Sequence, residues 1–223
     1  SPDDNVTALG LYKYYEDDDN FEIGIDEAGR GPLFGRLYTA AVILPKDDSI
    51  NHDLFKDSKR FSKKSKMDEV AEYIKQNAVS WSVNYIDEKT IDKINIRQSV
   101  LKCMHNSVKG TLDKIDIPSA RLLVDGSDFK PYIHMYYGEI EECPYITIEG
   151  GDNKYTAIAA ASILAKVARD QYIGALVAEN PILEERYGIG SNKGYGAKKH
   201  MDGIKQYGIT KWHRKTYGIC KRY

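Results

Sequence analysis

A long apolar helix is the feature that most constrains how this chain can fold. Residues 155–178 are rich in Ala, Ile, Leu and Val and follow a glycine turn at Gly150-Gly151. Asn180-Pro181 ends the predicted helix, because the residue before a proline is pushed out of the helical conformation. A helix with this much apolar surface needs a hydrophobic layer to pack against.

Strand-like segments before this helix supply that layer. Four are short apolar runs and one alternates apolar and polar residues: 21–26, 37–44, 121–124, 145–149 and, alternating, 79–86. Helical spacing is found at three further places: 66–76, 87–108 and 197–207. This order predicts an α/β fold with a mixed five-stranded sheet flanked by helices. The first strands would be joined directly and the later ones by crossovers.

Positive charge is concentrated in two places, although the net charge is only -1. Residues 191–223 hold nine Lys or Arg and one acid, a balance of +8, so the rest of the chain carries -9. A second basic cluster lies at 56–66. Basic patches on an otherwise acidic chain indicate a polyanion bound at one face, with a merely solvated surface as the alternative.

Cysteine usage and hydropathy bear on the compartment. Cys103, Cys143 and Cys220 are odd in number, widely spaced and without a CxxC pattern, which predicts free thiols in a reducing compartment. No apolar run reaches the roughly 18 residues of a membrane span, and the acidic N-terminal residues lack the apolar part of a signal peptide. We therefore expect a cytoplasmic protein without a membrane partner, or a nuclear one in a eukaryotic host. A monomer is the default, because no coiled-coil pattern is present.

Four acidic residues have an unusual placement. Asp26 and Glu27 follow an apolar strand directly, Asp125 ends another strand before a glycine, and Asp170 lies on the long helix. Carboxylates at strand ends are the oxygen ligands that Mg²⁺ and Mn²⁺ require. Each also has a plainer interpretation: Asp125 as a turn former and Asp170 as the ion-pair partner of Lys166 or of its neighbouring arginine. Spacing alone does not show that the four converge.

The motifs around these acids resemble those of the type 2 ribonucleases H. They occur in family order and span residues 21–217: IGIDEAGRGP at 23–32, DSK at 57–59, LVDG at 123–126, GDNK at 151–154, the helix signature at 158–170, SNKGYG at 191–196 and HRK at 213–215. One glycine tripeptide would be weak support, but the ordered set is specific. The first glycine motif has Arg30, whereas the third type of bacterial ribonuclease H typically has lysine there.

The resemblance implies a fold, a reaction and a metal site. The fold is ribonuclease H-like, with a helical C-terminal subdomain. The reaction is hydrolysis of the RNA strand of RNA–DNA hybrids, and cutting at ribonucleotides embedded in duplex DNA, leaving 3′-OH and 5′-phosphate ends. Asp26, Glu27, Asp125 and Asp170 are the implied catalytic residues and ligands, with Asp26 bridging two Mg²⁺ or Mn²⁺ ions.

The resemblance also implies a set of substrate-binding residues. Gly29, Arg30 and Gly31 would present backbone groups to the ribose 2′-OH, which only RNA carries. Tyr195 would stack on the deoxyribose next to an RNA–DNA junction, with core packing as the alternative. Four cations would contact phosphates or organise the site: Lys59, Lys154, Lys193 and Arg214.

The same resemblance suggests how the chain is divided. We expect a flexible acidic segment at 1–20, a catalytic domain at 21–180 and a basic substrate-binding subdomain at 181–223. Two departures from the family pattern stand out. Arg36 occupies a position where proline is common and would add a phosphate contact or project into solvent. Residues 132–143 have no obvious counterpart.

Two other functions stay open at this point. A non-catalytic nucleic-acid-binding subunit could keep the fold without the activity, and it would lack metal-dependent thermal stabilisation. A resolvase- or transposase-like nuclease of the same fold would use similar acids, but it would cut all-DNA junctions and have no use for a 2′-OH-reading loop.

Overall fold

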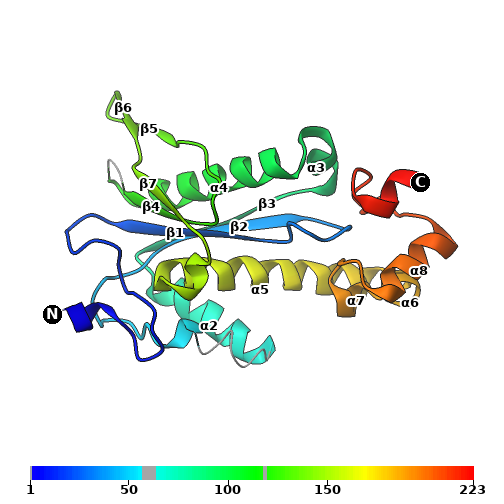
Figure 1. Ribbon diagram of the computed structural model, residues 1–223, viewed down its shortest axis with the longest axis horizontal. Coiled ribbons are helices and arrows are strands. Elements are labelled where there is room, and N and C mark those ends of the chain that lie inside the picture. Colours follow the sequence, from blue (N-terminus) through cyan, green and yellow to red (C-terminus); the bar gives the residue numbers. More distant parts are fainter. Residues whose placement is uncertain (1, 57–63, 118–119) are drawn as a thin grey trace.

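A five-stranded mixed sheet forms the centre of the computed structural model, which describes residues 2–56, 64–117 and 120–223 (Figure 1). In the order β3-β2-β1-β4-β7, the strands are Ser80–Ile86, Leu37–Ile43, Glu22–Ala28, Arg121–Asp125 and Tyr145–Ile148. The pairs β1–β2 and β2–β3 are antiparallel, and β1–β4 and β4–β7 are parallel. The predicted mixed sheet, with direct connections first and crossovers later, is confirmed.

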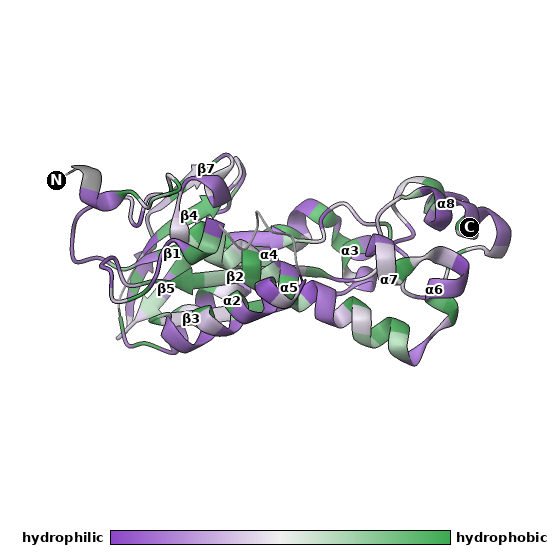
Figure 2. Cartoon of the chain, turned by 90° about the horizontal axis from the view of Figure 1, so that it is seen from below, coloured by the Kyte–Doolittle hydropathy of each residue, from purple (hydrophilic) through white to green (hydrophobic). Residues whose placement is uncertain are grey.

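Helices cover both faces of this sheet (Figure 1). One face packs against α4, and the other against α5 and α2. The helices are α2 Lys64–Asn77, α3 Glu88–Ile94, α4 Ile96–Asp113, α5 Thr156–Glu179, α6 Ile182–Tyr187, α7 Ile189–Asn192 and α8 Lys198–Tyr207. The predicted helical stretch 87–108 is two helices, because Asn95 has a positive φ of 73° and its side chain accepts a hydrogen bond from the backbone of Gln98. Figure 2 shows hydrophobic residues concentrated in the sheet and hydrophilic ones over much of the C-terminal helices.

Helix α5 lies directly on the central strand β1. A Cβ atom at Gly24 would be 2.1 Å from the carbonyl carbon of Ala157, so this position requires glycine. Because side chains alternate along a strand, Asp26 lies on the same face of β1 as Gly24. The close packing of α5 on β1 therefore holds in place the strand whose end carries Asp26 and Glu27.

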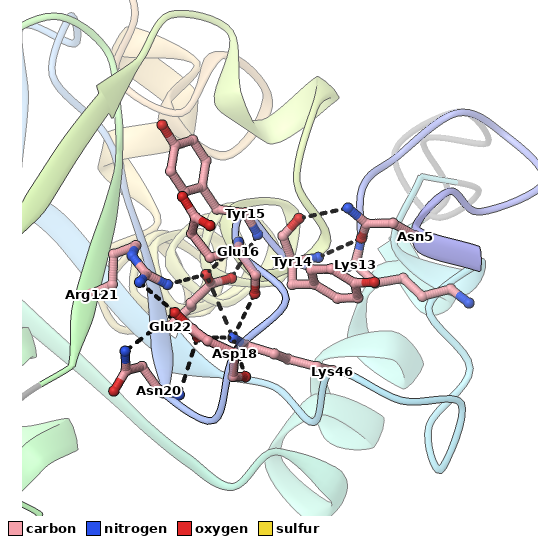
Figure 3. A network of polar contacts seen from close by, with 10 residues as sticks. All are labelled: Asn5, Lys13, Tyr14, Tyr15, Glu16, Asp18, Asn20, Glu22, Lys46 and Arg121. Atoms are coloured by element: carbon pink, nitrogen blue, oxygen red, sulfur yellow. Dashed lines mark hydrogen bonds and ion pairs between the residues drawn. The ribbon is translucent and has the colours of Figure 1, made fainter. Parts of the chain in front are cut away.

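The N-terminal segment packs along the body of the protein. Leu11 is fully buried in the core, and Tyr12 exchanges backbone hydrogen bonds with Lys154 and Thr156. Figure 3 shows the anchor: the buried carboxylate of Glu22 accepts hydrogen bonds from the backbone N–H groups of Tyr15 and Glu16. The expected flexibility of residues 1–20 stays a prediction, whereas Leu11 belongs to the same hydrophobic core as β2 and α5.

One arginine and one lysine side chain complete this anchor (Figure 3). Arg121 of β4 contacts Glu22 and Asp18, each at 2.7 Å. Lys46 contacts Asp18 at 2.9 Å and Glu22 at 3.7 Å. The acidic character of the segment therefore serves, in part, to attach it to the start of β1 and β4.

Two regions differ from the sequence prediction. Residues 132–143 form a hairpin of β5, Ile133–Tyr136, and β6, Glu139–Glu142, joined by Tyr137-Gly138, where both residues have positive φ. The short helices α6 and α7 were also not predicted, because a helix of one or two turns has too few residues to show a period. With α8 they enclose a small core of their own, which includes Leu183, Ile204 and Phe34.

Cys103, Cys143 and Cys220 are buried with free thiols, as predicted. Among the described residues, no helix has the length and apolar character needed to cross a membrane.

Candidate metal centre and substrate cleft

The parallel pairing of β1 and β4 brings acidic residues together at one edge of the sheet. Ile25 lies opposite Val124, so Asp26 and Asp125 follow at adjacent positions, at the carboxyl ends of neighbouring strands. Asp26, Glu27 and Asp125 each offer an oxygen atom, and these three atoms lie within 4.8 Å of one another. Three of the four predicted carboxylates thus converge, a grouping that could hold a metal ion.

This cluster concentrates negative charge in a poorly solvated place. Asp26 is only 5% exposed, and burial, followed by repulsion from Asp125 and Glu27, raises its pKa well above the usual value. Burial also raises the pKa of Glu27, and burial together with the charge of Asp152 raises that of Asp125. The Oδ1 atom of Asp125 is buried and accepts no hydrogen bond from the described residues. A divalent cation would satisfy both the charge and this oxygen.

Asp170, the fourth predicted acid, lies outside the group of three. It projects from α5, and its Oδ2 atom is 3.5 Å from the Nζ atom of Lys166, so the predicted ion pair with Lys166 is present. Asp170 also lines a pocket of about 220 Å³ together with Glu27. The remaining lining residues come from the glycine loop, α5 and the C-terminal subdomain: Ala28, Gly29, Ser162, Lys166, Arg169, Lys193 and Tyr195. Two of the four carboxylates, Glu27 and Asp170, therefore line a cleft together with the predicted substrate-binding residues Gly29, Lys193 and Tyr195.

Two buried arginines hold the loop between β1 and β2. The guanidinium of Arg214 is fully buried and donates to the backbone carbonyl groups of Gly29, Arg30 and Gly35. This burial and these three hydrogen bonds favour the second of the two alternatives expected for Arg214, organising the site, over a direct phosphate contact.

Arg169 of α5 performs the same task from the other side. Its guanidinium donates to the carbonyl groups of Phe34, Arg36 and Lys193 and therefore joins the loop to the C-terminal subdomain. Burial and the nearby Arg214 lower the pKa of Arg169 to about 10, which leaves it protonated at neutral pH. From the sequence, Arg169 was expected only as a possible ion-pair partner of Asp170. Its spacing of four from the buried Ala165 would have indicated a buried position.

Arg36 does not project freely into solvent, which was one of the two roles expected for it. Its guanidinium lies between two aromatic rings, 3.9 Å from the centre of Tyr85 and 4.4 Å from that of Tyr172. It also donates a hydrogen bond to the hydroxyl of Tyr38. Cation–π stacking on two rings ties the start of β2 to β3 and α5, so this arginine does not project freely into solvent, and the phosphate contact stays a prediction.

The glycine loop and Tyr195 face one another across the cleft. Gly29 has φ +90°, and a Cβ there would lie 2.4 Å from Nε of Arg169, so the backbone has the tight conformation that glycine permits. A Cβ on Gly31 would lie 3.5 Å from the ring of Tyr195, which is about half exposed. The side chain of Arg30 is also half exposed, with Nη1 3.9 Å from Glu27.

The three predicted lysines have different surroundings. Lys193 has a left-handed backbone (φ 57°) and lines the cleft. Lys154 is exposed in the turn before α5, where its carbonyl accepts a hydrogen bond from Tyr12. Lys59, with the motif Asp57-Ser58-Lys59 and half of the basic residues of the cluster at 56–66, lies outside the residues that the structure describes.

Comparison with known proteins gives a consistent result. The family model described as ribonuclease HII matches residues 23–220. A ribonuclease HII from Bacteroides thetaiotaomicron is 40% identical over 205 residues, covering 92% of this chain and 93% of that protein.

Solved structures share the fold. The ribonuclease H2 of Pyrococcus horikoshii OT3 superposes with a TM-score of 0.67 at 24% identity, covering 91% of this chain and 96% of that one. Bst-RNase HIII in complex with Mn²⁺ gives a TM-score of 0.53 at 18% identity, covering 84% and 70%.

Proposed function

The chain belongs to the ribonuclease HII family and is a ribonuclease H-type hydrolase, and on that premise we propose that it cuts RNA–DNA hybrids and DNA duplexes containing single ribonucleotides. The observation that carries this proposal is the group of three carboxylates at the ends of β1 and β4, of which Glu27 lines a cleft together with Gly29 and Tyr195. Hydrolysis would leave 3′-OH and 5′-phosphate ends.

The donor set fits a divalent metal. Asp26, Glu27 and Asp125 supply only oxygen atoms, and Asp125 Oδ1 lacks a hydrogen-bond donor among the described residues. We propose that these three residues, with Asp170 at the cleft wall, hold two Mg²⁺ or Mn²⁺ ions. Such ions, when bound, lower the pKa of an attacking water and stabilise the leaving 3′-oxygen. The protein itself would contribute crowded, poorly solvated carboxylates that bind the cations and a rigid loop that aligns the scissile phosphate.

The glycine loop is suited to recognising a ribose. The carbonyl groups of Gly29 and Arg30 already accept hydrogen bonds from Arg214. Within the described part of the chain, no hydrogen bond uses the backbone N–H groups of Arg30 and Gly31. These groups therefore remain available to a 2′-OH or an adjacent phosphate oxygen, and glycine at position 31 leaves room for close approach.

The test of the reaction uses a labelled DNA duplex that contains one ribonucleotide, incubated with protein and Mg²⁺ or Mn²⁺. We expect a cut on the 5′ side of the ribonucleotide that EDTA abolishes and that an all-DNA duplex does not show. Cleavage of long hybrids alone would retain the ribonuclease H activity and remove the proposed reading of single ribonucleotides. Binding without any cleavage would favour the non-catalytic subunit.

The junction role of Tyr195 has its own test. Loss of one stacking ring costs about 1–3 kcal/mol, so Tyr195→Ala should slow cutting at the single ribonucleotide about tenfold or more and affect long hybrids less. Tyr207→Ala is the matched control, since Tyr207 is also about half exposed but lies on α8 against Arg186. An equal loss on both substrates would assign Tyr195 to packing.

A further inference from the structure

Two buried histidines are in direct contact inside the C-terminal subdomain. His200 lies on α8 and His213 in the segment that follows it, and neither is more than 1% exposed. Their Nε2 atoms are 2.9 Å apart. Both rings pack against the aromatic rings of Phe34 and Tyr187, so the pair is enclosed by apolar surface.

The outer contacts of the pair determine which nitrogen carries each proton. The backbone N–H of Thr210 donates to Nδ1 of His213 at 2.9 Å, so this nitrogen is an acceptor and the ring proton is on Nε2. At the other end, Nδ1 of His200 lies 2.8 Å from the carbonyl oxygen of Tyr195, which can only accept, so His200 carries its proton on Nδ1. Nε2 of His213 therefore donates to the unprotonated Nε2 of His200. All the contacts are satisfied when both rings are neutral.

This chain of hydrogen bonds ends on the residue that faces the glycine loop. It runs from Thr210 through His213 and His200 to the carbonyl of Tyr195. The same segments also hold the loop by backbone hydrogen bonds, because Leu33 donates to Gly194 and Gly35 donates to Trp212. The histidine pair therefore connects the backbone of Tyr195 to the segment around Trp212, which holds the end of the glycine loop.

We propose that His200 and His213 are positioning residues that fix the backbone of Tyr195 opposite Gly31 and so determine the preference for RNA–DNA junctions. This inference rests on the proposed function for the substrate, but the hydrogen-bond pattern itself does not. Protonation of either ring would place two N–H groups against one another. Burial lowers the pKa of both histidines, that of His213 to about 3, so the pair stays neutral and intact in neutral solution.

The first test compares cleavage of the single-ribonucleotide duplex with cleavage of a long hybrid. His200→Leu removes the donor to Tyr195. We expect the ratio of kcat/KM on the single-ribonucleotide duplex to kcat/KM on the long hybrid to fall about tenfold. His200→Asn places an amide N–H near the position of Nδ1 and should restore most of the ratio. His52→Leu is the control, because His52 is also buried and makes two hydrogen bonds, to Thr156 and Asp47, in a distant part of the protein.

The three variants separate positioning from stability. Loss of stability in all three, with a changed ratio only in His200→Leu, supports the proposal. An unchanged ratio in His200→Leu, or an equal fall in His52→Leu, overturns it. A wild-type protein that cuts neither substrate would instead contradict the proposed function.

A second test does not depend on activity. Long-range ¹H–¹⁵N spectra of protein labelled at histidine distinguish the two neutral tautomers. We expect His200 protonated on Nδ1 and His213 on Nε2 at neutral pH, with His213→Gln altering the His200 signals. Any other tautomer for either ring, or a charged ring at pH 7, would overturn the proposed chain of hydrogen bonds.

Discussion

Two groups of buried or partly buried charged side chains lie in this protein, and they differ in how completely they are hydrogen-bonded. The arginines Arg169 and Arg214 each donate three hydrogen bonds to backbone carbonyl groups. The carboxylates Asp26, Glu27 and Asp125 crowd together, and one of their oxygen atoms accepts no hydrogen bond from the described residues. Buried charge therefore does not by itself mark a reactive site. The incompletely satisfied group indicates where a ligand belongs, and the satisfied group indicates what supports it.

The largest effect we expect comes from the carboxylates. Asp125→Asn should reduce cleavage by about 10³-fold or more, equivalent to about 4 kcal/mol of transition-state stabilisation, because it removes charge from the cation site. Binding to uncut hybrid, measured in Ca²⁺ or without metal, should persist. Asp128→Asn, an exposed surface aspartate paired with Arg97, serves as the control. Wild-type cleavage by Asp125→Asn would show that Asp125 is not a metal ligand.

The arginines should show the reverse pattern. Arg214→Ala leaves three carbonyl groups without their donor, and we expect a loss of about 3 kcal/mol in the free energy of unfolding, with weaker cleavage as a consequence. Chemical denaturation measures this. Arg214→Lys keeps the charge but not the planar set of donors, so it should recover only part of the loss. The exposed Arg97→Ala should cost less than about 1 kcal/mol. A fully stable Arg214→Ala that has lost only substrate affinity would restore the phosphate-contact role.

The smallest effect is a gain in stability. Because the pKa of Asp26 is raised in the folded state, its protonated form stabilises the folded protein. This stabilisation is fully present below the pKa of the unfolded state, near 3.8, and is lost as the pH rises through the pKa of the folded state. In EDTA at pH 8, Asp26→Asn should therefore be more stable than the wild type by about 1 kcal/mol. The difference should shrink as the pH falls toward 4. Thermal unfolding at several pH values would show it, and a variant less stable than the wild type at pH 8 would contradict the crowding of the carboxylates.

The same contrast explains what the sequence could and could not predict. The sheet and the long helix followed from apolar runs, because a strand buried on both faces or a helix packed along its length needs many consecutive apolar residues. The carboxylates that we propose as metal ligands were identified through their motifs. Their convergence depends on the register of β1 against β4, which local spacing does not contain.

The burial of Arg214 could not be predicted from the local sequence. The family resemblance gave Arg214 as a phosphate contact or as a residue that organises the site, and the sequence does not decide between the two. The hydrogen bond from Arg214 to Gly29 joins positions 185 residues apart, so no local pattern indicates its burial. The hairpin of β5 and β6 was missed because its strands are largely exposed and β6 is mostly acidic, so neither shows the apolar run of a buried strand.

The pairing of β1 with β4 has a consequence for how the protein reaches its active form. The first paired residues of these strands, Glu22 and Arg121, are 99 positions apart, whereas β1, β2 and β3 pair with their neighbours along the chain. Closing so long a loop costs more chain entropy than forming the meander, and such contacts tend to form slowly. We expect the antiparallel strands to form first. The carboxylates would then meet only when the parallel half of the sheet docks, so that an incompletely folded chain has no competent centre with which to cut nucleic acid.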